Sequence, residues 1–262
     1  MRHRYEEMTT ADLAGEPNLA RAVAVVPIAA IEAHGPHLPL GTDAIIADGM
    51  VEAVLAHLPD GLCATFLPTL RIGKSLEHTR FPGTIDHDWR TATESLIAIG
   101  KSLHAAGFRR IAVVSSHGGN SPVMETAALE LRHSLGILVA TSSWMRFGIP
   151  AGLLPDAEIA TGIHGGAVET ALMLHFRPDI VRIDRLGSFS SLQSRLDQEN
   201  THLRAHGRLA FGWMSHDLNP AGVVGDTRLA TAEIGRVIAE HQAAGFTTFL
   251  AEIAAFDLGR LE

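Results

Sequence analysis

Short apolar runs alternate along the first half of the chain with longer segments in which apolar residues recur at helical spacing. The apolar runs cover residues 22–31, 62–67, 111–114 and 137–141. Helical spacing follows them over residues 43–57, 88–106 and 121–133. Because strands that alternate with helices usually pair in parallel, this pattern predicts an α/β fold of βαβ units around a mostly parallel sheet.

The second half is less regular. Gly and Pro are frequent up to residue 162, residues 166–177 have the pattern of a helix, and Pro178 ends it. Residues 183–226 show no clear periodicity, and a last helical pattern over 227–244 is expected to cover the sheet. No repeat or shift in composition marks a boundary, so we expect one domain over residues 1–262.

Composition narrows the class of protein. Hydrophobic residues make up 46% and charged residues 19% of the 262 residues, as in ordinary globular domains. A net charge of −8 argues against nucleic-acid and anionic-membrane partners, because both bind clustered Lys and Arg. The chain has no apolar leader and no run of about 18 apolar residues. We therefore expect a cytoplasmic protein.

Polar, Gly-rich segments follow three of the expected strands, and they carry several of the fifteen histidines. Glu32 and His34 are two apart, so both side chains project from the same face of an extended segment. Asp43 follows a turn rich in Gly and Pro, and its two oxygens could bridge two cations. His117 ends another strand, and His164 precedes Glu169 by five residues. Ligands gather beyond the carboxyl ends of parallel strands, so these residues are expected to meet.

Each residue also has a structural interpretation. Glu32 and His34 could be a satisfied polar pair, and Asp43 could cap a helix. His117 could mark a tight turn, and Glu169 could be an acidic residue of a first helical turn. The placement of all five at strand ends or in the loops beyond them favours a metal site.

Four segments resemble motifs of the creatininase (creatinine amidohydrolase) family. They are EAHGPHLPLGTD at 32–43, GKSLEHTRFPGT at 73–84, HGGN at 117–120 and HGGAVET at 164–170. A fifth segment, GVVGD at 222–226, also resembles the family, so the resemblance covers most of the chain.

This resemblance implies a three-layer α/β/α fold and assembly into homohexamers. It also implies that the protein is a metal-dependent amidohydrolase that acts on carbon–nitrogen bonds other than peptide bonds, with a small-molecule amide as substrate. It implies two divalent ions, zinc or manganese, with iron also occurring in the family. Asp43 would bridge the two ions; Glu32 and His117 would complete one site, and His34 and Glu169 the other. His164 would be the catalytic proton shuttle. Ser75 would contact substrate, unless its hydroxyl only caps the loop.

The chain departs from creatininase itself at two places. Gly118 and Gly119 stand where the family's namesake has Tyr and a metal-assisting Glu, and Ala160 stands where it has a Trp that covers the creatinine ring. These departures argue against creatinine as substrate. Branches of the family that share Gly-Gly-Asn hydrolyse a formamide or trim a modified precursor peptide.

Three hypotheses follow from the sequence. The first is the two-metal amidohydrolase that cleaves an amide, cyclic amide or formamide. The second is a single-metal deformylase or peptidase for a modified precursor peptide, and the third is a non-catalytic metal-binding scaffold. The aromatic residues Trp144, Phe147, Phe211 and Trp213 could pack in the core or line a substrate pocket.

Overall fold

A four-stranded parallel sheet forms the centre of the protein. The computed structural model describes residues 1–261. The strands are β1 (Val23–Ile28), β2 (Ala64–Phe66), β3 (Arg110–Ser115) and β4 (Leu138–Ser143), and their order in the sheet is β2-β1-β3-β4. Ile28 at the end of β1 is in register with Ser115 at the end of β3. The two central strands therefore deliver the chain to the same edge of the sheet.

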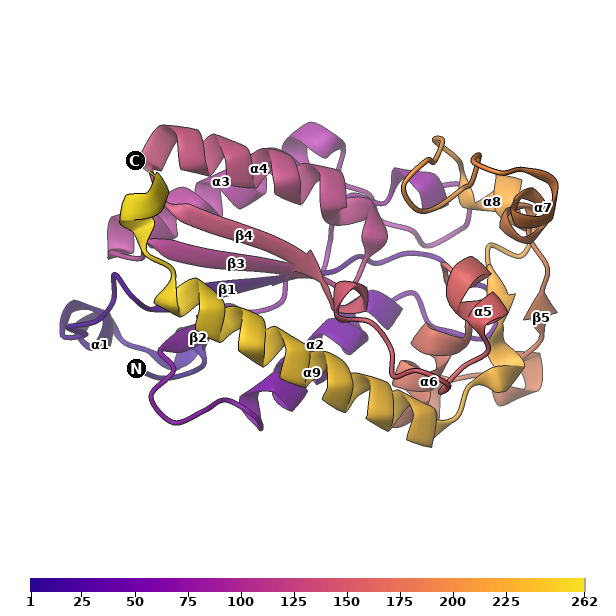
Figure 1. The fold of residues 1–262 in the computed structure, drawn as a ribbon, viewed down its shortest axis with the longest axis horizontal. Helices are drawn as coiled ribbons and strands as arrows, with labels where there is room; N and C mark the ends of the chain where they lie inside the picture. The colour runs from indigo at the N-terminus through magenta and orange to yellow at the C-terminus, as the bar shows by residue number, and fades with distance from the viewer. Residues whose placement is uncertain (262) are drawn as a thin grey trace.

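Helices cover both faces of the sheet (Figure 1). Helices α3 (Trp89–Ala106) and α4 (Ser121–Leu135) lie on one face, and α2 (Thr42–Leu55), α6 (Ala167–Phe176) and α9 (Ala232–Ala255) lie on the other. Alternate residues of β1 supply the two cores: Val25 packs in the same cluster as Phe246 of α9, whereas Val26 packs with Leu96 of α3. The expected three-layer α/β/α fold is confirmed.

Local sequence explains the ends of α3. The Asp88 side chain accepts hydrogen bonds from the backbone N–H groups of Arg90 and Thr91, which have no partner within the helix. Gly107 ends the helix with a φ of 117°, in the left-handed region where a residue with a Cβ is strained. The helix predicted over 88–106 therefore forms as expected.

Most predicted bounds differ from the structure by one or two residues, and two elements differ by more. The strand expected over 22–31 is shorter and covers Val23–Ile28; beyond it, Ala29 N still bonds Leu70 O, and Ile31 forms only an isolated bridge with Ile85. The helix expected over 227–244 begins only at Ala232, where the Thr231 side chain caps it, and it runs on to Ala255. Apolar residues in its last turns bury themselves against the sheet and extend the helix.

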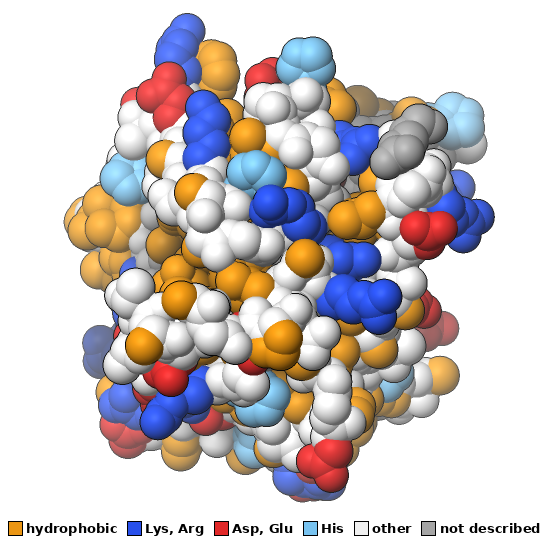
Figure 2. All heavy atoms as spheres, turned by 90° about the vertical axis from the view of Figure 1, so that its left-hand side faces the viewer, with side chains coloured by type: hydrophobic (Ala, Val, Ile, Leu, Met, Phe, Trp, Pro, Cys, Tyr) orange, Lys and Arg blue, Asp and Glu red, His pale blue; other side chains and the backbone are white. Residues whose placement is uncertain are grey.

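Short elements gather beyond the carboxyl ends of the strands, on the right of Figure 1. They include α5 (Asp156–Thr161), α7 (Leu192–Glu199), α8 (Ser215–Leu218) and the antiparallel pair of β5 (Ser188–Phe189) and β6 (Gly225–Asp226). Both termini and α1 (Thr10–Ala14) lie at the opposite end. Figure 2 views that opposite end, where Lys and Arg side chains gather near the middle of the face. Among residues 1–261, no helix is both long and apolar enough to cross a membrane.

Candidate metal centre

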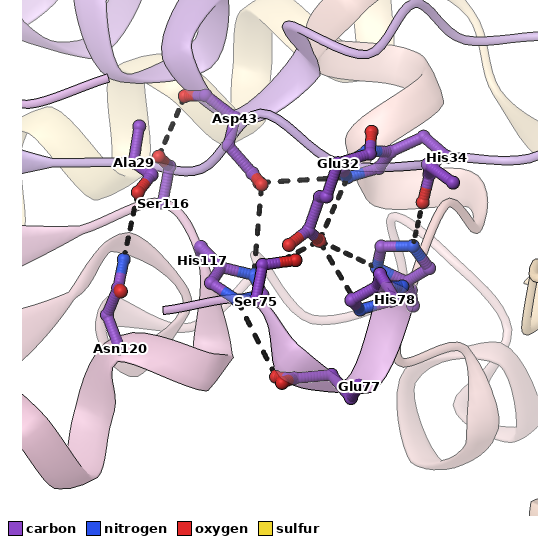
Figure 3. Close-up of polar contacts among 12 residues, drawn as sticks. Ala29, Glu32, His34, Asp43, Ser75, Glu77, His78, Ser116, His117 and Asn120 are labelled. Carbon is purple, nitrogen blue, oxygen red and sulfur yellow. Dashed lines mark hydrogen bonds and ion pairs between the residues drawn. The ribbon is translucent and has the colours of Figure 1, made fainter. Parts of the chain in front are cut away.

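Glu32 is the centre of a buried cluster at the carboxyl edge of the sheet (Figure 3). Its side chain is fully buried, and neither carboxylate oxygen has a hydrogen-bond partner among residues 1–261. Four imidazole nitrogens surround Oε1 instead. The distance from Oε1 is 3.1 Å to His117 Nδ1, 3.4 Å to His78 Nε2, 3.7 Å to His164 Nδ1 and 4.0 Å to His34 Nε2. Buried carboxylate oxygens without donors are costly unless a cation or a proton lies beside them.

Asp43 occupies the first turn of α2 and faces the same cluster. It does not cap the helix, as the structural interpretation would require, because α2 begins at Thr42 and Gly41 is the cap residue. Both Asp43 oxygens are buried without a partner among the described residues. Oδ1 lies 3.7 Å from His34 Nε2, and Oδ2 lies 3.8 Å from His117 Nδ1. Asp43 therefore stands between the two imidazoles, with one oxygen toward each.

The backbone fixes which nitrogen of each imidazole faces the carboxylates. His34 Nδ1 lies 3.1 Å from the carbonyl of Glu32, and His117 Nε2 lies 3.0 Å from the carbonyl of Lys74. A carbonyl oxygen only accepts, so these nitrogens carry the protons and donate them. In the neutral rings, His34 Nε2 and His117 Nδ1 are left with lone pairs that point at carboxylate oxygens, an arrangement that metal ligands have.

Glu169 completes the group from the first turn of α6. One carboxylate oxygen accepts a hydrogen bond from Gly165 N and lies 3.9 Å from His34 Nε2. The structure thus brings together two sets of three ligand atoms, each within 4.8 Å of one another: Glu32, Asp43 and His117, and His34, Asp43 and Glu169. Asp43 belongs to both sets. A third grouping, Glu32 with His34 and His164, overlaps them.

The electrostatics of the metal-free cluster show an excess of negative charge. Burial and the neighbouring Glu32 raise the pKa of Asp43 well above its usual range. Burial opposes a charge on His117, but the carboxylates of Glu32, Asp43 and Glu77 outweigh it and raise the pKa of the imidazole to about 10. Protons therefore bind where carboxylates converge, and a divalent cation would satisfy the same charge. The donor set of carboxylates and imidazoles fits zinc or manganese.

His164 lies at the boundary between this cluster and a cleft. Its Nε2 donates to the Ala33 carbonyl at 2.8 Å, so Nδ1 faces Glu32. The ring lies against those of His34 and His78, with centroids 4.3 and 4.1 Å away. These contacts fix the imidazole with Nδ1 directed toward the Glu32 carboxylate, while His164 also lines the cleft.

Ser75, the predicted substrate contact, is buried. Its side chain is fully buried, its Oγ has no partner among residues 1–261, and its backbone N donates to Asp86 Oδ1 at 2.6 Å. Figure 3 shows Ser75 beside Glu32 and His117. Ser75 is also absent from the residues that line the cleft described below.

Two further residues at the site escaped sequence reasoning. Asn120 donates to the carbonyl of Ala29 at 3.1 Å and accepts from Lys74 N at 3.0 Å, and so ties together the segments that follow β1, β2 and β3. Its position in the Gly-Gly-Asn motif was the available signal. Glu77 lies 3.6 Å from His117 Nε2, and no local pattern indicated it.

A cleft leads from the ligand cluster to the surface. Its inner part, about 330 Å³, is lined by His117, His164 and Glu169, and its outer part, about 550 Å³, by Phe211 and Trp213. Lys74, Glu77, Pro122 and Trp213 line both parts. Phe211 and Trp213 line the cleft and pack against the small cluster of Ala205, Leu218 and Val224. Trp144 and Phe147 pack against Phe246 in the core, and Trp144 also lines a separate cavity that reaches Glu169.

Comparison with known proteins shows which family this chain resembles in sequence. A family model described as "Creatininase: Creatinine amidohydrolase" matches residues 6–250. The chain is 34% identical over 222 residues to a mycofactocin precursor peptide peptidase of Mycobacterium tuberculosis (strain ATCC 25618 / H37Rv), covering 82% of this chain and 78% of that protein. It is 32% identical over 181 residues to a creatinine amidohydrolase of Pseudomonas putida, covering 63% and 68%.

Solved structures share the fold. A creatininase described as the Mn form aligns with a TM-score of 0.73 at 23% identity, over 96% of this chain and 98% of that one. A mutant creatininase of Zn–Zn type aligns with a TM-score of 0.74 at 24% identity, over 96% and 98%.

Proposed function

Because this chain belongs to the creatininase family of metal-dependent amidohydrolases, we propose that it hydrolyses a carbon–nitrogen bond at a two-metal centre that shares Asp43. Glu32 and His117 would hold one ion, and His34 and Glu169 the other. The observation that carries the proposal is that buried ligand atoms of both sets lack hydrogen-bond partners within residues 1–261. Zinc and manganese occur in related creatininases and suit these donors.

Four expectations from the sequence stay predictions. They are the use of iron, assembly into a homohexamer, a cytoplasmic location, and one hydrolase domain over 1–262.

The bound ions would lower the pKa of a water toward neutrality and polarise the carbonyl that it attacks. The protein supplies the rest of the chemistry. The unpartnered carboxylates of Glu32 and Asp43 balance the cationic charge, and the backbone carbonyls of Glu32 and Lys74 hold both imidazoles in the ligand tautomer. His164 Nδ1, directed into the site by the bond from Nε2 to Ala33, is placed to give a proton to the leaving nitrogen.

A peptide is the substrate class that two observations favour. Relatives that match 82% of the chain are named mycofactocin precursor peptide peptidases, whereas the creatinine amidohydrolase matches 63%. The cleft continues past the inner part around His117 and His164 to an outer part lined by Phe211 and Trp213, which suits an extended chain. A small cyclic amide or formamide would need only the inner part. Ala160 offers no ring to cover creatinine.

The test is a hydrolysis assay on the zinc-loaded and manganese-loaded protein with three substrate sets: peptides, small cyclic amides including creatinine, and formamides. We expect cleavage of a peptide amide, its loss after chelation, and its return when the metal is added back. Cleavage confined to small amides would overturn the peptide assignment and leave the amidohydrolase intact. Absence of metal-dependent hydrolysis across all sets would overturn the proposed function.

A further inference from the structure

Glu77 lies on the side of His117 that faces away from the ligand cluster (Figure 3). His117 Nδ1 faces Glu32 at 3.1 Å, while Nε2 faces the Lys74 carbonyl at 3.0 Å and Glu77 Oε1 at 3.6 Å. The imidazole therefore has a carboxylate at each of its two nitrogens. Only the inner carboxylate is in a ligand set.

Gly119 makes room for the outer carboxylate. A Cβ at this position would overlap both Glu77 Oε1 and His117 Nε2. The φ of Gly119 is not in the left-handed region, so backbone conformation does not require a glycine here. The requirement is the close approach of Glu77 to the imidazole edge.

A short 3₁₀ turn, Leu76–His78, presents two side chains to the same pair of residues. Glu77 reaches the outer edge of His117, and His78 Nε2 lies 3.4 Å from Glu32 Oε1. The Lys74 ammonium holds Glu77 from the other side, and the Glu77 side chain is only 13% exposed. The carboxylate thus lies at the rim of the cleft, between the Lys74 ammonium and the His117 imidazole.

We propose that Glu77 is a positioning residue that acts through His117: the Lys74 carbonyl holds Nε2–H, and Glu77 keeps negative charge beside that edge of the imidazole, which strengthens His117 as a metal ligand. A carboxylate behind a ligating histidine orients the ring and raises its basicity, and removal of such a group weakens metal affinity about 10- to 100-fold. The inference rests on the proposed function, because it assumes that His117 binds a metal.

The experiment is zinc titration of the metal-free protein by calorimetry, with E77Q and K74M compared. E77Q removes the charge but keeps the shape of the side chain. K74M breaks the same ion pair from its other end and leaves the Glu77 carboxylate beside His117. We expect E77Q to weaken one of two zinc sites about 10- to 100-fold and K74M to stay within about threefold of wild type.

Equal losses in E77Q and K74M would show that the ion pair only anchors the loop, and this would overturn the inference. Wild-type affinity at both sites in E77Q would overturn it too. A second variant, E77D, withdraws the carboxylate from His117 by one methylene and should show an intermediate loss; it decides the question if E77Q does not fold. A wild-type protein that binds no zinc would overturn the inference together with the proposed function, whereas two wild-type sites unaffected by E77Q and E77D would overturn the inference alone.

Discussion

Glu32 Oε1 lies 3.1 Å from His117 Nδ1, and this approach joins the segment that follows β1 to the segment that follows β3. The parallel register explains it, because Ile28 pairs with Ser115 and both chains leave the sheet at the same edge. Asp43 enters from the first turn of α2 and Glu169 from that of α6. The cluster is therefore a product of topology, because it joins residues 32–43 to His117 and Glu169, which are far away in sequence.

Replacement of Asp43 and of Glu169 should have different effects on metal content. Asp43 belongs to both ligand sets and Glu169 to one, so we expect D43A to retain fewer than about 0.5 ions per chain and E169A to retain about one. Elemental analysis of the metal-loaded proteins measures this. D184A, which changes an exposed acid, is the control and should keep the wild-type value. If E169A kept both ions, or if D43A kept one, the shared-carboxylate arrangement would be wrong.

Replacement of His164 should impair turnover without loss of metal. In H164Q the side-chain amide can still donate to Ala33, but it cannot deliver a proton, so kcat should fall about 10²- to 10⁴-fold. Steady-state kinetics and metal content should be measured on the same sample, with H57Q as a control at an exposed histidine. A kcat within threefold of wild type would remove His164 from the reaction.

The stability of the metal-free protein should depend on pH through His37. Burial and the neighbouring His34 lower the pKa of His37 to about 4, and its Nε2 lies 2.9 Å from Thr170 Oγ1. Above a pH of about 6.5 the ring is neutral in both the folded and the unfolded state, so its titration does not change the free energy of unfolding. As the pH falls from about 6.5 toward 4, the unfolded chain takes up the proton first, and the folded state loses at most about 3 kcal/mol.

Urea unfolding in chelator at pH 7 and pH 4.5 tests this dependence. H37Q lacks the titrating group, so its loss of stability over this interval should be smaller than that of wild type. The other side chains are the same in both proteins, so the difference reports the contribution of His37. The same loss in both proteins would contradict the assignment to His37.

A methyl group at Gly235 should destabilise the fold. A Cβ there would overlap the carbonyl oxygen of Ala171, where α9 crosses α6. Although Ala usually stabilises a helix relative to Gly, we expect G235A to lower the free energy of unfolding by about 1–3 kcal/mol through overpacking. G212A, where a Cβ meets nothing within 4 Å, is the control and should lie within about 0.5 kcal/mol of wild type. Denaturant unfolding measures this free energy. A G235A protein more stable than wild type would contradict the prediction, because it would show that α6 and α9 can move apart without loss of stability.

Sequence patterns predicted the part of the fold that local physics determines. The strands and the ends of α3 follow from apolar runs, an Asp cap and a C-terminal glycine. The start of α9 was placed too early, because Thr227–Leu229 form a separate 3₁₀ turn before the Thr231 cap. Residues 183–226 gave no signal because their elements are short and are held by hydrogen bonds to residues distant in sequence, such as the three that join Gly187 to Thr227.

The candidate site divides in the same way. Strand-end positions in the sequence are enough to bring Glu32, Asp43 and His117 into one hypothesis. Glu77 was missed because its position depends on the absence of a side chain at Gly119, a residue of another segment. Such a relationship exists only in three dimensions, and no periodicity in the sequence indicates it.

The central claim is that Asp43 bridges two ions, and anomalous scattering from crystals of the zinc-loaded protein tests it most directly. We expect two peaks in the buried cluster, one against Glu32 and His117 and the other against His34 and Glu169, each with an oxygen of Asp43 as ligand. A single peak in this cluster, or two peaks of which only one contacts Asp43, would contradict the account.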